Sequence, residues 1–174
     1  MSAGAGRVIV IGSSNTDLVV HCDWLPEAGQ TVLGGALRII PGGKGANQAV
    51  AAARAGARVL FIGAFGDDDF GGSRRMDLEA DGVDISGSVV KKGVPSGVAL
   101  IAIGGGRSTR AENQIVVAPG ANARLTAADV RRGLPRLSPK DVVLGSLEVP
   151  YAAIEEGFWL ARRAGALTIL NPAP

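Results

Sequence analysis

The sequence predicts an α/β fold in which a parallel β-sheet is flanked by helices, and three observations support this prediction. Short runs of β-branched and other apolar residues recur along the chain, as strands buried on both faces require. Segments with apolar residues at helical spacing lie between them, so strands and helices alternate. The chain has 174 residues, of which 47% are hydrophobic and 20% charged, which is enough for about one domain with a buried core.

The first part of the chain contains two predicted strands and one helix. Residues 8–11 form an uninterrupted apolar run, and residues 59–62 form a second one. Between them, residues 46–53 carry apolar side chains at helical spacing, and Gly56 is suited to end that helix.

A second helix is predicted after residue 125. Thr126 and Asp129 resemble a capping box, and the apolar face of this helix is expected to continue through Val130, Leu134 and Leu137. Residues 142–144 are the strand that follows it.

The last predicted helix and strand complete the alternation. Pro150 is well placed at the start of the helix, and Gly165 is placed to end it. Residues 167–170 are the final strand. Three residues at helical spacing form the buried face of the helix: Ile154, Phe158 and Ala161.

Two segments interrupt the alternation of strands and helices. Residues 16–40 contain strand-like runs without a helix, and residues 97–118 contain two runs around a Gly/Arg/Ser turn at 104–109. These segments are typical of β-hairpins inserted between the βα units. Two such insertions can form a small sheet that serves as a lid, or they can be edge hairpins of the main sheet, and the pattern leaves both possibilities open.

The composition excludes several classes of function. The net charge is +2, basic residues are scattered among acidic ones and aromatic residues make up 4%, so no nucleic-acid surface is predicted. Cys22 and His21 are the only residues of their types, which excludes an internal disulfide and a zinc site of ordinary spacing. No apolar run has the length of a signal peptide or a membrane span, so we expect a soluble cytoplasmic protein.

The sharpest motif is Pro-Gly-Gly-Lys-Gly-Ala-Asn-Gln at residues 41–48. This Gly-rich turn leads into a predicted helix, whose first backbone N–H groups are expected to be free to meet a ligand. It is not a Walker A loop, because Gly45 follows Lys44, and the first strand is not followed by a G-x-G-x-x-G pattern, so a dinucleotide is not expected. A plain capping loop is the alternative.

Polar residues follow two of the predicted strands. Asn15 and Asp17 come after residues 8–11, and Glu148 comes after residues 142–144, at the ends where open parallel sheets bind ligands. In extended backbone Asn15 and Asp17 point the same way, and an amide beside a carboxylate can bracket neighbouring sugar hydroxyls. A turn-forming Asn, a solvated Asp and a Glu at a helix start are the alternatives. Together with the Gly-rich turn, these residues favour a polyol pocket.

Motifs along the whole chain resemble the N-terminal portion of the PfkB-type carbohydrate kinase family, and within it the ribokinase group. The Gly-Gly-Lys-Gly-Ala-Asn-Gln block is the most specific of them. The resemblance implies a truncated, ribokinase-like Rossmann-type α/β domain over residues 1–174, with a β-lid from insertions at about 16–40 and 97–118. Six blocks carry the resemblance: residues 12–17, 41–48, 63–71, 119–122, 147–150 and 171–174.

The resemblance also implies a function. It implies ATP-dependent phosphorylation of a pentose, D-ribose to ribose 5-phosphate, with Mg²⁺ and a monovalent cation such as K⁺, and a homodimer that pairs through the lid. Seven residues that match the family motifs would contact the sugar: Asn15, Asp17, Gly42, Gly43, Lys44, Asn47 and Glu148.

One family motif does not occur in this sequence. The family places its catalytic base in a Gly-Ala-Gly-Asp motif, so we expect the base and most of the nucleotide and cation sites beyond residue 174. No catalytic residue is therefore assigned, and the 174-residue chain alone is expected to be inactive. The acidic run at residues 67–69 is interpreted as a loop and helix-start cluster rather than a Mg²⁺ site.

Two further interpretations of the sequence stay open. The chain can be a non-catalytic sugar-binding or subunit-interaction module that uses the same pocket and lid. It can also be a partly folded fragment, in which the exposed sheet beyond residues 167–170 causes aggregation.

Overall fold

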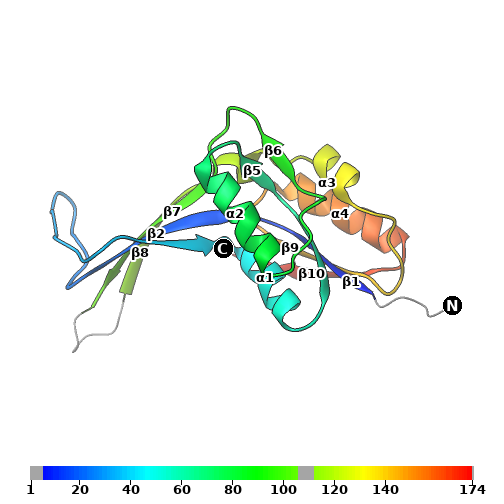
Figure 1. Cartoon of the computed structure of the whole chain (residues 1–174), viewed down its shortest axis with the longest axis horizontal. Helices are drawn as coiled ribbons and strands as arrows, with labels where there is room; N and C mark the ends of the chain where they lie inside the picture. The colour runs from blue at the N-terminus through cyan, green and yellow to red at the C-terminus, as the bar shows by residue number, and fades with distance from the viewer. Residues whose placement is uncertain (1–5, 106–111, 174) are drawn as a thin grey trace.

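The computed structural model describes residues 6–105 and 112–173, and its centre is a four-stranded sheet in the order β10-β9-β1-β4 (Figure 1). Every pair of neighbouring strands is parallel, with Val8 of β1 opposite both Val59 and Val142. The α/β class with a parallel sheet, as predicted from the sequence, is confirmed. The strands are β1 (Arg7–Ile11), β4 (Arg58–Ile62), β9 (Val142–Ser146) and β10 (Leu167–Asn171).

Helices cover both faces of this sheet. Neighbouring residues of a strand point to opposite faces, so β1 contributes Ile9 and Ile11 to one hydrophobic core and Val10 to the other. The core around Ile9 packs against α3 and α4, whereas the core around Val10 packs against α1 and α2. In the part of the chain that the structure describes, no helix is both long and apolar enough to cross a bilayer. The helices are α1 (Lys44–Arg54), α2 (Asp69–Ala80), α3 (Ala127–Gly133) and α4 (Tyr151–Arg163).

The two segments that interrupt the alternation contribute to one second sheet, in the order β3-β2-β7-β8. β2 and β7 pair in parallel at its centre, and β3 and β8 run antiparallel on either side. This sheet extends away from the helix-covered part of the molecule (Figure 1). Its action as a lid stays a prediction, and most of the predicted 104–109 turn lies outside the described residues. The strands are β2 (Asn15–Cys22), β3 (Arg38–Gly42), β7 (Gly97–Gly104) and β8 (Glu112–Ala118).

The helix after Thr126 is shorter than predicted. Its capping box is present, because Asp129 N donates to Thr126 Oγ1 at 3.1 Å and Thr126 N donates to Asp129 Oδ2 at 2.9 Å. The helix ends just before Leu134, whose backbone is extended. A proline follows Leu134, and a residue before proline disfavours the helical conformation. Leu134 and Leu137 therefore lie outside the helix, although both pack against the core.

Four elements were not delimited from the sequence, although the start of one of them, α2, was indicated by the acidic run at residues 67–69. They are α2, the paired parallel strands β5 (Ala64–Gly66) and β6 (Val89–Lys91), and the 3₁₀ helix η1 (Gly120–Arg124). The acidic run at residues 67–69 precedes α2, and Asp68 is the N-cap of this helix. The acidic run therefore has the helix-start role that the sequence suggested.

Candidate functional site

Three segments far apart in the sequence meet beyond the C-terminal end of β1. They are the turn between β1 and β2, the start of α1 and the segment after β9. The backbones come very close, because a Cβ added to Gly45 of α1 would lie 2.6 Å from Gly12 Cα. Gly43, the N-cap of α1, has a φ of 94°, which other residues rarely adopt. The Gly-rich motif thus allows these three segments to pack together.

The first three backbone N–H groups of α1 bind partners within the protein. Lys44 N donates to Glu148 Oε2 at 2.9 Å. Gly45 N donates to Ser13 Oγ at 3.4 Å, and Ala46 N donates to Ser13 O at 2.8 Å. The expectation that these groups are free for a ligand is therefore wrong. A carboxylate of this chain already lies at the positive end of the helix dipole.

Glu148 joins the three segments. Its Oε2 also accepts a hydrogen bond from Ser13 Oγ at 2.5 Å, and its Oε1 lies 3.6 Å from Lys44 Nζ. Glu148 thus interacts with the N-terminus of α1. Ser13, which is fully buried, was not selected from the sequence. The only signal for it was its position in the motif block that begins at Gly12.

Asp17 lies on β2, with its carboxylate against the backbone of β3. A Cβ added to Gly42 would be 2.2 Å from Asp17 Oδ1, so a larger residue at Gly42 would displace this side chain. Burial and the nearby Glu148 carboxylate raise the pKa of Asp17 above its usual range, whereas Arg74 and Lys44 oppose that shift. Asp17, Lys44 and Glu148 therefore share one electrostatic site.

Asn15 and Asn47 complete the set of predicted site residues. Asn15 is buried opposite Gly42 of β3, and its Oδ1 accepts a hydrogen bond from Asn122 Nδ2 at 2.7 Å. Asn47 lies in the first turn of α1 with an exposed side chain, and its N–H donates to Gly43 O at 2.9 Å. All seven predicted residues lie on these three segments and the adjoining strands, and their contact with a sugar stays a prediction.

The described residues do not offer a metal site of their own. Within residues 6–105 and 112–173, no three His, Cys, Asp or Glu side chains are grouped so that they could hold an ion. Asp67 and Asp68 accept backbone hydrogen bonds from Gly93 at 2.9 Å and from Ser96 at 2.8 Å. These residues do not fit the Mg²⁺ that the resemblance implies, so we assign no step to a metal held by them.

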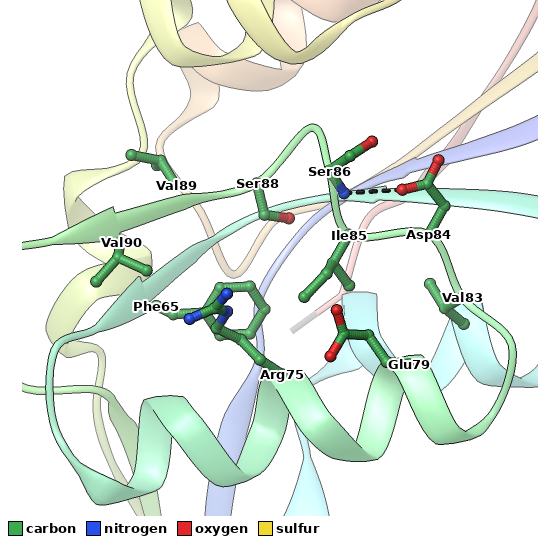
Figure 2. Close-up of a pocket in the computed structure, with 10 residues that line it drawn as sticks. All are labelled: Phe65, Arg75, Glu79, Val83, Asp84, Ile85, Ser86, Ser88, Val89 and Val90. Carbon is green, nitrogen blue, oxygen red and sulfur yellow. Dashed lines mark hydrogen bonds between the residues drawn. The ribbon is translucent and has the colours of Figure 1, made fainter.

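A cavity of about 340 Å³ lies elsewhere, between α2 and the β5–β6 pair (Figure 2). Phe65 and Ile85 are among its apolar lining residues, and Arg75 and Glu79 extend to it from α2. It contains none of the seven predicted residues. The candidate site is therefore the junction of the three segments and not this cavity.

Comparison with known proteins gives consistent similarities. The chain matches the description "pfkB family carbohydrate kinase" over residues 5–174. Ribokinase of Bacillus subtilis (strain 168) is 41% identical over 168 residues, which covers 97% of this chain and 56% of the relative. The ribokinase structure from Cryptococcus neoformans var. grubii serotype A in complex with ADP has a TM-score of 0.83 at 32% identity, over 99% of this chain and 51% of that one.

A third relative has been solved with sugar and nucleotide. The structure of Arabidopsis thaliana ribokinase complexed with ribose and ATP has a TM-score of 0.78 at 26% identity, over 96% of this chain and 53% of that one. The chain thus spans about half the length of the relatives it matches. Because the family match covers nearly all of its residues, the resemblance inferred from the motifs is confirmed, and the chain belongs to the pfkB family of carbohydrate kinases.

Proposed function

We propose that this chain forms the sugar-binding part of an ATP-dependent pentose kinase that converts D-ribose to ribose 5-phosphate. The observation that carries the proposal is the group of Asp17, Lys44 and Glu148 around one junction. A sugar hydroxyl both donates and accepts hydrogen bonds, so carboxylates beside an ammonium group suit a polyol. The solved relative complexed with ribose and ATP supports this substrate class.

Each residue has a distinct role in this proposal. Glu148 Oε2 already accepts hydrogen bonds from Lys44 N and Ser13 Oγ, so Oε1 is the oxygen that accepts from a sugar hydroxyl. Asp17 accepts from a second hydroxyl, and the glycines let the sugar approach the backbone. The full set of proposed sugar contacts is Asn15, Asp17, Gly42, Gly43, Lys44, Asn47 and Glu148.

The second sheet is proposed to close over the bound sugar. Asp17 lies on this sheet, so a hydroxyl that binds its carboxylate also binds the sheet. Closure excludes water, which would otherwise compete with the sugar for the phosphoryl group. The catalytic base and the groups that hold ATP, Mg²⁺ and K⁺ are assigned to the half of the relatives that this chain does not span.

A fusion protein tests this proposal. It joins this chain to the half of Bacillus subtilis ribokinase that the chain does not match. We expect ATP-dependent phosphorylation of ribose by the fusion and none by the 174-residue chain alone. Asp17→Asn in the fusion removes a charged acceptor and should lower kcat/KM about tenfold or more, whereas Asp23→Asn, at an exposed position, should not. A folded fusion without turnover contradicts the kinase proposal, and turnover by the chain alone contradicts the division of roles.

A second candidate function is subunit interaction, alone or together with sugar binding. Ile39, Leu100 and Val116 lie in one row across the second sheet, and each is more than half exposed. This row is on the face opposite Asp17, because their common partner Leu18 is the next residue along β2. Such a row favours pairing with the same surface of a second copy.

Sedimentation velocity tests this pairing. The chain is expected to sediment as a dimer, and Leu100→Lys is expected to convert it to a monomer because the charge would be buried in the contact. Met76→Lys, at an exposed position on α2, is the matched control and should remain dimeric. A monomeric parent protein rejects the pairing.

A further inference from the structure

The side chain of Asn122 connects η1 to the first residues of the candidate site. It is 1% exposed and makes three hydrogen bonds. Its Oδ1 accepts from Ser14 N at 3.0 Å, and its Nδ2 donates to Ser14 O at 3.1 Å. The same Nδ2 donates its other proton to Asn15 Oδ1 at 2.7 Å.

These bonds determine which way both amides face. A backbone N–H can only donate and a backbone carbonyl can only accept, so Ser14 requires Oδ1 of Asn122 on one side and Nδ2 on the other. Nδ2 of Asn122 then requires an acceptor from Asn15, which is Oδ1. The amide nitrogen of Asn15 is therefore the atom that remains for another partner.

We infer that Asn122 is a positioning residue that fixes the Asn15 amide as a hydrogen-bond donor to the sugar. This inference rests on the proposed sugar site. Asn15 and Asp17 lie two residues apart on one strand and face the same side. A donor from Asn15 beside an acceptor from Asp17 selects a ligand whose neighbouring hydroxyls accept at one position and donate at the other.

Gly97 provides the space for this interaction. It is the partner of Asn15 across the β2–β7 pair. A Cβ added to Gly97 would lie 2.2 Å from Asn122 Nδ2 and 2.3 Å from Asn15 Oδ1. Gly97→Ala should therefore separate the two amides without changing either of them.

The first test is a double-mutant cycle on ribose affinity, measured by calorimetry. Asn122→Asp has nearly the same shape but cannot donate, so the Asn15 amide rotates to donate to the new carboxylate and turns its oxygen toward the sugar. We expect the Kd for ribose to rise about tenfold or more. In an Asn15→Ala background the same substitution should change the Kd less than twofold.

Controls separate positioning from a general loss of structure. Asn113→Asp makes the same chemical change at an exposed position of β8 and should leave the Kd within twofold of the parent. If Asn122→Asp does not fold, Gly97→Ala provides the same cycle with Asn15→Ala. If the fold-changes in Kd of the two single variants simply multiply in the double variant, the inference is overturned, because Asn122 then acts independently of Asn15.

A second readout does not depend on ribose. Both Nδ2 protons of Asn122 are hydrogen-bonded in the parent protein and should exchange slowly with water in NMR spectra. Asn15→Ala should accelerate the exchange of one of them, and rapid exchange of both in the parent would overturn the inference. A parent protein with slow exchange but no ribose binding would reject the proposed function while the amide orientation stands.

Discussion

At the scale of single residues, Asp17 destabilises the fold in its charged form. Burial and Glu148 raise the pKa of Asp17, so the folded protein holds this proton more tightly than the unfolded chain does. The protonated carboxyl of Asp17 therefore stabilises the folded protein relative to the charged form. This stabilisation is fully present below the unfolded pKa of about 3.9, and it is lost as the pH rises through the higher pKa of the folded protein.

Asp17→Asn is thus expected to increase the urea midpoint of unfolding at pH 7, because the amide imitates the protonated acid. The gain should shrink as the pH is lowered toward about 4. Asp23→Asn, at an exposed position, should change the midpoint little at either pH. A lower midpoint for Asp17→Asn at pH 7 would show that the charged form of Asp17 stabilises the fold, which is the opposite of the expected result.

The pKa of Asp129 is shifted in the opposite direction, so the charged form of this residue stabilises the fold. Burial alone would raise its pKa, but hydrogen bonds from Lys91, at 2.6 Å, and from Thr126 lower the pKa of Asp129 to about 2. The stabilisation of the fold by the Asp129 carboxylate is present above about pH 3.9, and it is lost as the pH falls through about 2. Asp129→Asn should lower the free energy of unfolding by about 2 kcal/mol at pH 7.

Urea titrations between pH 2 and pH 7 measure this difference. The gap between Asp129→Asn and the parent protein should close as the pH approaches 2. Glu155→Gln, at an exposed position of α4, serves as the control and should change the free energy of unfolding at pH 7 by only a few tenths of a kcal/mol. A gap that is constant with pH would mean that the carboxylate charge does not matter.

The sequence allowed some site residues to be selected, but not all. Asn15, Asp17 and Glu148 follow predicted strands, so their position alone suggested them. Ser13 and Asn122 act through hydrogen bonds to partners more than 100 residues away in the chain. Both residues lie in blocks that carry the family resemblance, but such contacts leave no local pattern, so only the folded structure shows what these two residues bind.

At the scale of elements, Asp68 fixes the start of α2. Its Oδ1 accepts from Gly71 N at 2.8 Å and from Ser96 Oγ at 2.5 Å, and its Oδ2 accepts from Ser96 N at 2.8 Å. Asp68→Ala removes the cap and the link to Ser96, and it should lower the free energy of unfolding by about 2 kcal/mol.

Chemical denaturation with urea measures this effect. Asp69→Ala, which removes only a charge near the helix dipole, should cost a few tenths of a kcal/mol and serves as the neighbouring control. Equal losses for the two variants would mean that the cap does not hold α2.

The buried strands were the easiest elements to predict, because short uninterrupted runs of β-branched residues are typical of strands that are covered on both faces. For α2 the sequence indicated only the helix start at residues 67–69, because only Gly71, Arg74 and Leu78 of its residues are buried, which leaves almost no apolar stripe to show its course. β5 and β6 have three residues each, too few for a pattern. The proline after Leu134 indicates the end of α3, but the helical spacing of Val130, Leu134 and Leu137 led to the prediction of a longer helix.

At the scale of the whole molecule, the second sheet was only partly predictable. The sequence indicated strands in residues 16–40 and 97–118 but left their partners open. Their assembly depends on the parallel pairing of β2 with β7, which joins distant parts of the chain. On the main sheet, the side chains of β10 at Leu167, Ile169 and Leu170 are each more than two-fifths exposed. This exposed edge is consistent with a chain that spans about half the length of its relatives.

The turn after β1, the start of α1 and Glu148 are proposed to form one pentose site together. Calorimetric titration of the 174-residue chain with D-ribose tests this proposal most directly. We expect saturable heat with one site per chain at millimolar ribose or below, and at least tenfold weaker binding for Asp17→Asn. A folded chain that gives no heat up to millimolar ribose, or one that binds equally well with Asp17→Asn, would contradict it.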